Sequence, residues 1–179
     1  MATDLHCSQK IPKANPMTNR PQQQTFKSLT AFGIAWGEKV KRTSAEARCI
    51  RKAITLHQPW AWAIAHAGKD IENRTWEPPA SVIGCRIAIH AGKVLDRDGL
   101  DDLWDLGIKP TKDELVRGAI VAVCTLTGYV RESDSPWFTG PIGWTLEDVV
   151  AIEPVPCRGF QGLWPLPPDI KKLVTARMP

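Results

Sequence analysis

The stretch Ala67-Gly68-Lys69-Asp70-Ile71-Glu72-Asn73-Arg74-Thr75-Trp76 carries an unusual density of charged and aromatic side chains. Gly68 is a typical residue just beyond a helix C-terminus. The residues from Asp70 to Trp76 then predict a strand, whose period of two sends Glu72, Arg74 and Trp76 to one face. The stretch therefore predicts a helix end followed by a strand with a charged face.

The elements around this stretch predict an α+β fold. A strand at Ala53–Leu56 leads through Pro59, which suits a first helical turn, into a helix that ends near Ala67. Further strands are predicted at 86–90, 119–130, 143–146 and 149–155. Helices are predicted at 96–106, after a capping box that begins at Thr111, and at 169–177. Short strands with a few short helices indicate a small curved or barrel-like sheet.

Two details of this prediction concern single residues. Ala91-Gly92 is predicted to turn the chain sharply after the strand that ends at His90. Trp104 has helical spacing with Leu100 and Leu103, which predicts that it packs in the core.

Length and charge divide the chain into two parts. With 179 residues, of which 43% are hydrophobic, it is long enough for one packed domain and an appendage. Residues 1–52 hold 10 Lys and Arg against 3 Asp and Glu, a net charge of +7, whereas residues 53–179 hold 13 against 16, a net charge of −3. We predict a basic, largely disordered tail at 1–50 and a folded domain at 51–179.

Composition argues against several classes of protein. No apolar run is long enough for a membrane span and no secretory signal is evident, so we expect no membrane partner and a cytoplasmic location. The five cysteines are scattered without a C-x-x-C pair, which argues against a disulfide framework or a zinc ribbon. We expect no metal ion and no cofactor.

Several motifs, in a consistent order, resemble the ASCH domain, a branch of the PUA-like superfamily. The signature G-x-K-x-x-E-x-R is matched at Lys69, Glu72 and Arg74, with Ala67 in place of the first glycine. The similarity extends over about 110 residues, from Ala53 to Trp164. Further positions that look like those of the family lie in 56–61, 72–76, 89–91, 143–144 and 159–164.

The resemblance implies a compact PUA-like β-barrel with flanking short helices and a cleft that binds RNA, a nucleotide or a modified nucleobase. Arg and Lys side chains suit phosphates or base carbonyls, a carboxylate suits an exocyclic amine, and tryptophans offer stacking surfaces. The candidate ligand-binding residues are Gln58, Lys69, Glu72, Arg74, Trp76, His90 and Trp144.

The alternative is a hydrolase that acts on an RNA phosphodiester or a modified nucleoside, with Lys69 and Glu72 as the catalytic residues. One branch of the family deacetylates N4-acetylcytidine with a Lys-x-x-Thr pair; here Glu72 replaces that threonine, which disfavours this chemistry. A metal-free ribonuclease would need Glu72 or His90 as its base and Lys69 and Arg74 as cations. Two further hypotheses are that the charged residues form a salt-bridged network without a ligand, and that the domain is a protein-interaction module.

Overall fold

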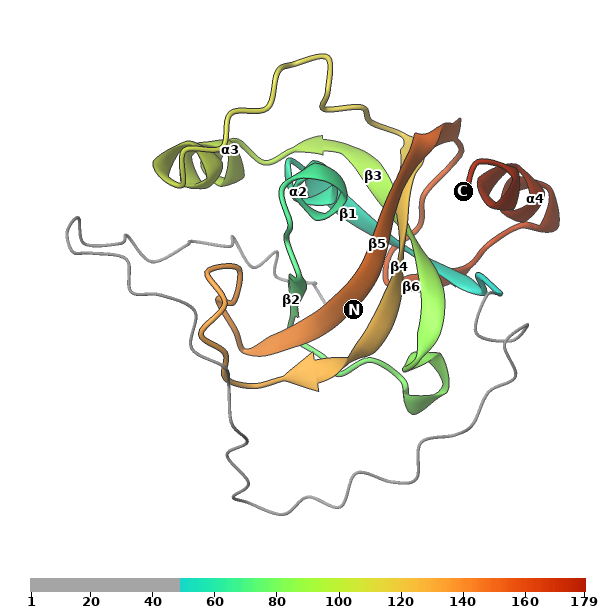
Figure 1. The fold of residues 1–179 in the computed structure, drawn as a ribbon, viewed down its shortest axis with the longest axis horizontal. Coiled ribbons are helices and arrows are strands. Elements are labelled where there is room, and N and C mark those ends of the chain that lie inside the picture. The colour runs from blue at the N-terminus through green and yellow to red at the C-terminus, as the bar shows by residue number, and fades with distance from the viewer. Residues whose placement is uncertain (1–48) are drawn as a thin grey trace, which may run out of the picture.

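Six strands form a mixed, curved sheet in residues 49–179, the part of the chain that the computed structural model describes (Figure 1). The sheet order is β2-β5-β4-β3-β1-β6, in which β1 and β3 are parallel and the other pairs are antiparallel. The strands are β1 (Lys52–Gln58), β2 (Ile71–Arg74), β3 (Cys85–Leu95), β4 (Ala119–Val130), β5 (Ile142–Pro156) and β6 (Leu163–Pro165).

Helices α2 (Trp60–His66) and α4 (Pro168–Ala176) pack against this sheet, α3 (Arg97–Asp105) packs beside α2, and a 3-10 turn, η1, spans Ala80–Val82. Helix α2 follows Pro59 and ends before Gly68, whose φ of 69° confirms the predicted stop. The Asp96 carboxylate caps α3 by accepting a hydrogen bond from the Gly99 backbone N–H at 3.1 Å. No helix in residues 49–179 has the length and apolarity to cross a lipid bilayer.

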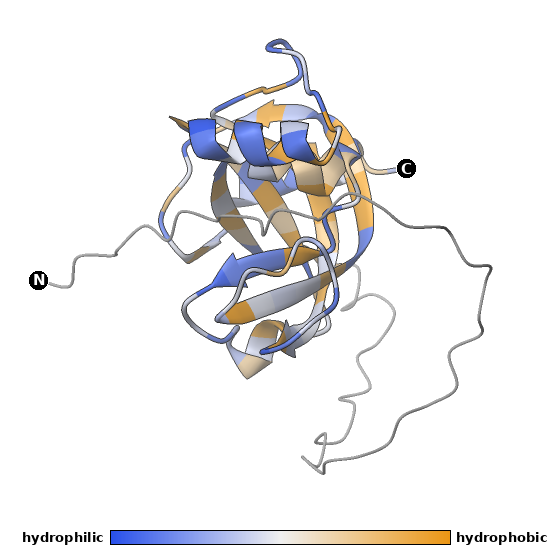
Figure 2. Ribbon diagram, turned by 90° about the vertical axis from the view of Figure 1, so that its left-hand side faces the viewer, coloured by the Kyte–Doolittle hydropathy of each residue, from blue (hydrophilic) through white to orange (hydrophobic). Residues whose placement is uncertain are grey.

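Alternating side chains place apolar residues on both faces of the sheet. In β1, Ile54 and Leu56 pack under α2, whereas Ala53 belongs to a second cluster that includes Val174 of α4. A third cluster joins α2 to α3 through Trp60 and Leu103. The outer side of α3 is hydrophilic, with the apolar strands behind it (Figure 2). Both faces of the sheet are therefore covered by packed apolar clusters.

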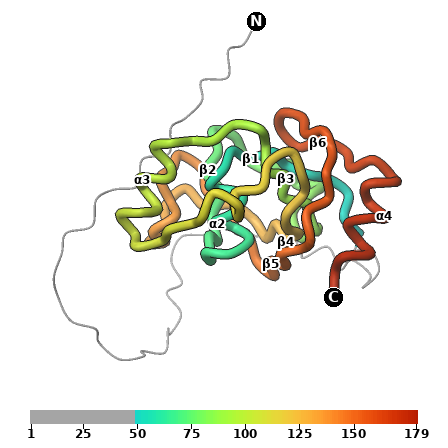
Figure 3. The backbone as a smooth tube through the Cα atoms, turned by 90° about the horizontal axis from the view of Figure 1, so that it is seen from above, coloured from blue at the N-terminus to red at the C-terminus, as the bar shows by residue number. Residues whose placement is uncertain are grey.

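The sheet is not closed into a barrel, so the barrel prediction is wrong, whereas the α+β prediction is confirmed. The edge strands β2 and β6 are only four and three residues long. Within the described residues, these two strands do not pair with each other. They lie apart at the two ends of the sheet (Figure 3). The predicted tail at 1–50 lies outside the described residues except for 49 and 50, and the predicted domain boundary stays a prediction.

The predicted turn at Ala91-Gly92 is wrong because β3 continues to Leu95. Ala91 pairs with β1 on one side and with β4 on the other, so extended backbone there is stabilised from both directions. Gly92 lies so close to β1 that an added Cβ would lie 3.1 Å from the Leu56 carbonyl oxygen. The glycine serves strand packing, and the extra length carries Lys93 to the rim of the sheet.

Two other local predictions also fail. Thr111 and Glu114 form the predicted capping contacts, with the Thr111 N–H donating to the Glu114 carboxylate at 2.7 Å, but only a turn follows before β4 begins. Trp104 is 52% exposed, whereas Leu103 is fully buried. Adjacent helical residues point about 100° apart, so the face that buries Leu103 turns Trp104 toward water.

Candidate functional site

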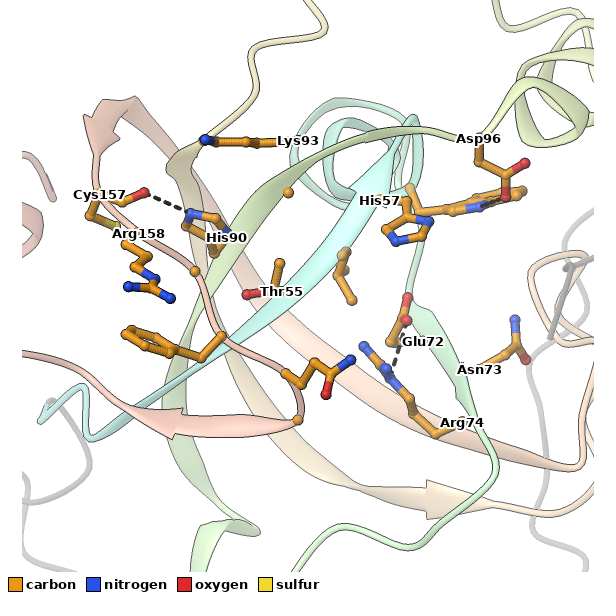
Figure 4. A pocket seen from close by; sticks show the side chains of 18 of the residues that line it. Thr55, His57, Glu72, Asn73, Arg74, His90, Lys93, Asp96, Cys157 and Arg158 are labelled. Atoms are coloured by element: carbon orange, nitrogen blue, oxygen red, sulfur yellow. Dashed lines mark hydrogen bonds and ion pairs between the residues drawn. The ribbon is translucent and has the colours of Figure 1, made fainter. Parts of the chain in front are cut away.

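A cleft of about 1030 Å³ opens between the two unpaired edges of the sheet (Figure 4). One wall is β2 and the residues after it, and the other is the segment 157–162, which links β5 to β6. Strands β1 and β3 form its floor through Thr55 and His90. The cleft therefore lies between the edge strand β2 and the segment that leads into the other edge strand, β6.

Glu72 is the central charged group of the β2 wall. It lines the cleft, is only 4% exposed, and accepts a hydrogen bond from Lys69 Nζ at 3.3 Å. Its other carboxylate oxygen pairs with Arg74 Nε at 3.4 Å. The two-residue spacing along β2 places both side chains on one face, as the sequence predicted, and Arg74 also lines the cleft.

Lys69 lies behind Glu72 and does not reach the cleft surface. Its side chain is fully buried, its Nζ donates to the Ile71 carbonyl oxygen, and it lies 5.7 Å from the centre of the Trp60 ring. Burial lowers the pKa of Lys69, and the Glu72 carboxylate opposes that shift. Lys69 therefore holds the carboxylate in place, whereas Glu72 and Arg74 face the cleft.

His90 lies on the floor near the other wall. Its Nε2 lies 3.1 Å from the Cys157 carbonyl oxygen, which can only accept, so Nε2 carries the proton. Burial lowers the pKa of His90 below its ordinary value, and the bond to Cys157 opposes this in part. The ring is therefore neutral at neutral pH, and it anchors segment 157–162 to β3.

The remaining predicted ligand residues divide into one that lines the cleft and two that do not. Trp76 lines it and packs edge-on against Trp144, with ring centroids 4.6 Å apart. Trp144 is fully buried and donates its indole N–H to the Trp76 carbonyl oxygen at 2.9 Å, so it supports Trp76 from the core. Gln58 lies apart and bonds to the backbone of Trp62 and Val116.

The structure adds cleft residues that the sequence prediction did not select. Lys93 comes from the extended part of β3, and Arg158 and Phe160 come from segment 157–162. The Arg158 guanidinium carbon lies 5.3 Å from the centre of the Phe160 ring. The run Arg158-Gly159-Phe160, a cation and an aromatic around a glycine, is a signal that could have identified this wall.

The lining chemistry suits a polar ligand with both charged and flat parts. Arg74, Lys93 and Arg158 provide cationic donors, Glu72 provides an acceptor, and aromatic rings line both walls. Across residues 49–179, no three His, Cys, Asp or Glu side chains gather in a way that could hold a metal ion. Typical small-molecule pockets hold about 300–1,000 Å³, so a nucleotide-sized ligand fits this volume.

Residues 54–140, which include β2 and most of the cleft floor, match the family of the ASCH domain. The chain contains an ASCH domain. No curated protein matches the chain in a sequence comparison. The ASCH match ends before segment 157–162, so one wall of the cleft lies beyond the matched residues.

Solved ASCH structures also resemble the chain. The crystal structure of ASCH from Zymomonas mobilis has 17% identity and a TM-score of 0.45, covering 72% of this chain and 95% of that one. A serine-to-alanine variant of that protein has 17% identity and a TM-score of 0.44, covering 72% and 96%. A tyrosine-to-phenylalanine variant has 16% identity and a TM-score of 0.45, covering 72% and 98%.

Proposed function

We propose that this ASCH domain binds RNA or a nucleotide in the cleft between β2 and segment 157–162. The observation that carries the proposal is the Glu72–Arg74 pair, which is held from behind by Lys69 and faces a space large enough for a nucleotide. Domains of the ASCH family are generally associated with RNA binding, which agrees with this chemistry.

The fixed geometry of the pair favours recognition of a base edge. A carboxylate accepts hydrogen bonds from an exocyclic amine, and a guanidinium donates to a carbonyl or a ring nitrogen. Because Lys69 and Arg74 already orient Glu72, little side-chain freedom is lost when a ligand binds. Trp76, half-buried beside the pair, offers an aromatic surface to the same ligand.

The test is the affinity of the full chain for a labelled single-stranded RNA, measured by fluorescence anisotropy for the wild type and for Arg74→Gln. We expect the variant to bind about tenfold more weakly, since hydrogen bonds to charged groups contribute about 1.5–3 kcal/mol. Arg131→Gln is the matched control, because Arg131 pairs with Glu77 in an exposed ion pair and does not line the cleft.

Equal affinity in Arg74→Gln and the wild type would contradict the proposed binding site. The affinity for single-stranded DNA of the same sequence separates recognition of the ribose from general binding of single strands. If the wild type binds neither nucleic acid, RNA binding is wrong, and a free nucleotide, a ligand-free salt-bridged network and a protein-interaction module are the hypotheses left to test.

The hydrolase alternative rests on Glu72, whose carboxylate lines the cleft although the residue is only 4% exposed. A general base must come within hydrogen-bond reach of the proton it removes. Lys69 lies behind Glu72, so only Glu72 of the predicted catalytic pair could contact a substrate, and we favour binding over turnover. Incubation with single-stranded RNA and acylated nucleosides tests the alternative, which requires turnover that Glu72→Gln abolishes.

A further inference from the structure

The carboxylates that line the cleft are confined to one part of it. Figure 4 shows Glu72, Arg74 and Asp96 at one end, and Lys93 and Arg158 at the other. Both lining carboxylates thus lie at the β2 end. The opposite end, here called the cationic end, carries the side chains of Lys93 and Arg158.

Segment 157–162 is fixed to the sheet at several points, so the cationic end is built into the fold. The Cys157 carbonyl oxygen accepts from His90, and the Cys157 N–H donates to the Gly118 carbonyl oxygen at 3.1 Å. Just beyond the segment, Trp164 Nε1 donates to Thr55 Oγ1 at 3.1 Å. At Gly159, an added Cβ would lie 2.4 Å from the His90 ring, so the segment packs directly on the floor.

The Arg158 guanidinium lies beside the Phe160 ring and, within residues 49–179, forms no ion pair with a carboxylate that lines the cleft. Its guanidinium carbon lies 5.3 Å from the Phe160 ring centre, and that ring in turn packs against Trp164 at 5.4 Å. Arg158 takes part in none of the ion pairs found in the described residues, in contrast to Arg74. The Arg158 guanidinium and the Lys93 ammonium line the same end of the cleft, and both are groups that bind phosphate.

We propose that the cationic end is a phosphate subsite, so that the cleft takes a phosphorylated nucleotide unit with its base toward Glu72 and Arg74. This inference rests on the proposed function, which it deepens by naming the ligand class and its direction. The shared chemistry is a phosphate linked to a ribonucleoside, either as the monoester of a free nucleotide or as the diester of an RNA strand.

The experiment compares ligands with and without phosphate on the full chain by isothermal titration calorimetry. The probes are the four ribonucleosides, their 5′- and 3′-monophosphates, and a short single-stranded RNA of mixed sequence. We expect the phosphorylated ligands to bind more tightly than the nucleosides. Arg158→Gln and Lys93→Gln should each reduce that advantage by about two- to fivefold, as for exposed ion pairs, and leave nucleoside affinity unchanged.

Salt dependence provides a second readout for the RNA probe. Each lost phosphate contact should lower the slope of log affinity against log salt by about 0.7, as for single strands. Lys172→Gln, an exposed lysine on α4 outside the cleft, is the control and should change neither affinity nor slope. Thermal unfolding of each variant verifies that it is folded.

The outcomes distinguish the two proposals. If Arg74→Gln weakens binding but the Arg158 and Lys93 variants bind phosphorylated ligands as the wild type does, the phosphate subsite is wrong and the proposed function stands. Equal weakening of nucleosides and nucleotides by these variants also overturns the subsite. If the wild type binds none of the probes, both proposals fail. Preference for monophosphates or for RNA identifies which source of phosphate the subsite accepts.

Discussion

At the residue scale, the fully buried Lys69 holds the Glu72 carboxylate of the β2 wall in place. Removing an ammonium from water is costly, and the cost is offset here by Glu72 and by the Ile71 carbonyl oxygen. The ion pairs of the predicted network and the predicted cleft therefore occur together. Lys69, Glu72 and Arg74 are paired, and two of the three also line the cleft.

Glu72→Gln should lower the free energy of unfolding by about 3 kcal/mol, because it leaves Lys69 buried without its counter-charge. Arg74→Gln should cost less than about 1 kcal/mol, since the Arg74 side chain is 22% exposed and water solvates it. Urea unfolding followed by tryptophan fluorescence measures both values. Equal losses would contradict the assignment of Lys69 as the buried partner.

His90 predicts a pH dependence of stability. Its pKa in the folded protein is below the ordinary value of 6.5, so below that pH the unfolded chain binds more protons and the folded state loses stability. His90→Gln retains a donor for the Cys157 carbonyl but does not titrate. Unfolding at pH 7.5 and 5.5 should show the wild type losing more stability than the variant, by at most about 1.4 kcal/mol per unit of pKa difference.

Parallel losses in the wild type and His90→Gln would show that other groups account for the acid sensitivity. The remaining titratable groups are common to both proteins, so the difference between the two reports on His90 alone.

At the scale of elements, segment 157–162 depends on one glycine. A methyl group at Gly159 would lie within 2.7 Å of His90 and Thr55, so Gly159→Ala must push the segment away from the floor. We expect a loss of about 1–3 kcal/mol in stability, as for overpacking, together with weaker RNA binding. Anisotropy and urea unfolding measure the two effects.

Gly107→Ala is the matched control for Gly159→Ala. Gly107 has a φ of 78° and open space around it, so the substitution costs about 1–2 kcal/mol of backbone strain far from the cleft. It should lower stability and leave affinity unchanged. If both variants bind RNA as the wild type does, the position of segment 157–162 is irrelevant to the site.

At the scale of the whole molecule, the basic front of the chain and the cleft should act together on RNA. Residues 1–48 hold 8 Lys and Arg against 3 Asp and Glu. Deleting them should weaken RNA binding and reduce its salt dependence, since each lost phosphate contact removes about 0.7 from the slope. The sheet and the three described helices all lie in the remaining residues 49–179.

Titrations of the full chain and of residues 49–179 across a range of salt concentrations test this expectation. If the affinity and the slope of log affinity against log salt are unchanged, residues 1–48 take no part in RNA recognition. The binding of nucleosides should be equal in both proteins, because a nucleoside carries no phosphate.

Local patterns in the sequence determined most of the elements of this protein. The strand at Ala119–Val130, the stop at Gly68 and the shared face of Glu72 and Arg74 follow from alternation and backbone preference, which act over a few residues. The extension of β3 beyond His90 was not predicted, because Gly92 is typical of a turn in the local sequence. The extended backbone there is stabilised by pairing of β3 with β1 and β4, which the local sequence does not show.

The site itself was decided by tertiary structure. Nothing local distinguishes Lys69, which is buried, from Arg74, which faces the cleft, and Gln58 and Trp144 were predicted as ligand contacts although packing directs them elsewhere. Arg158 lies opposite β2 only because the sheet stays open between its two short edge strands. Which side chains meet in that opening depends on contacts between distant segments, whose free energies the local sequence does not encode.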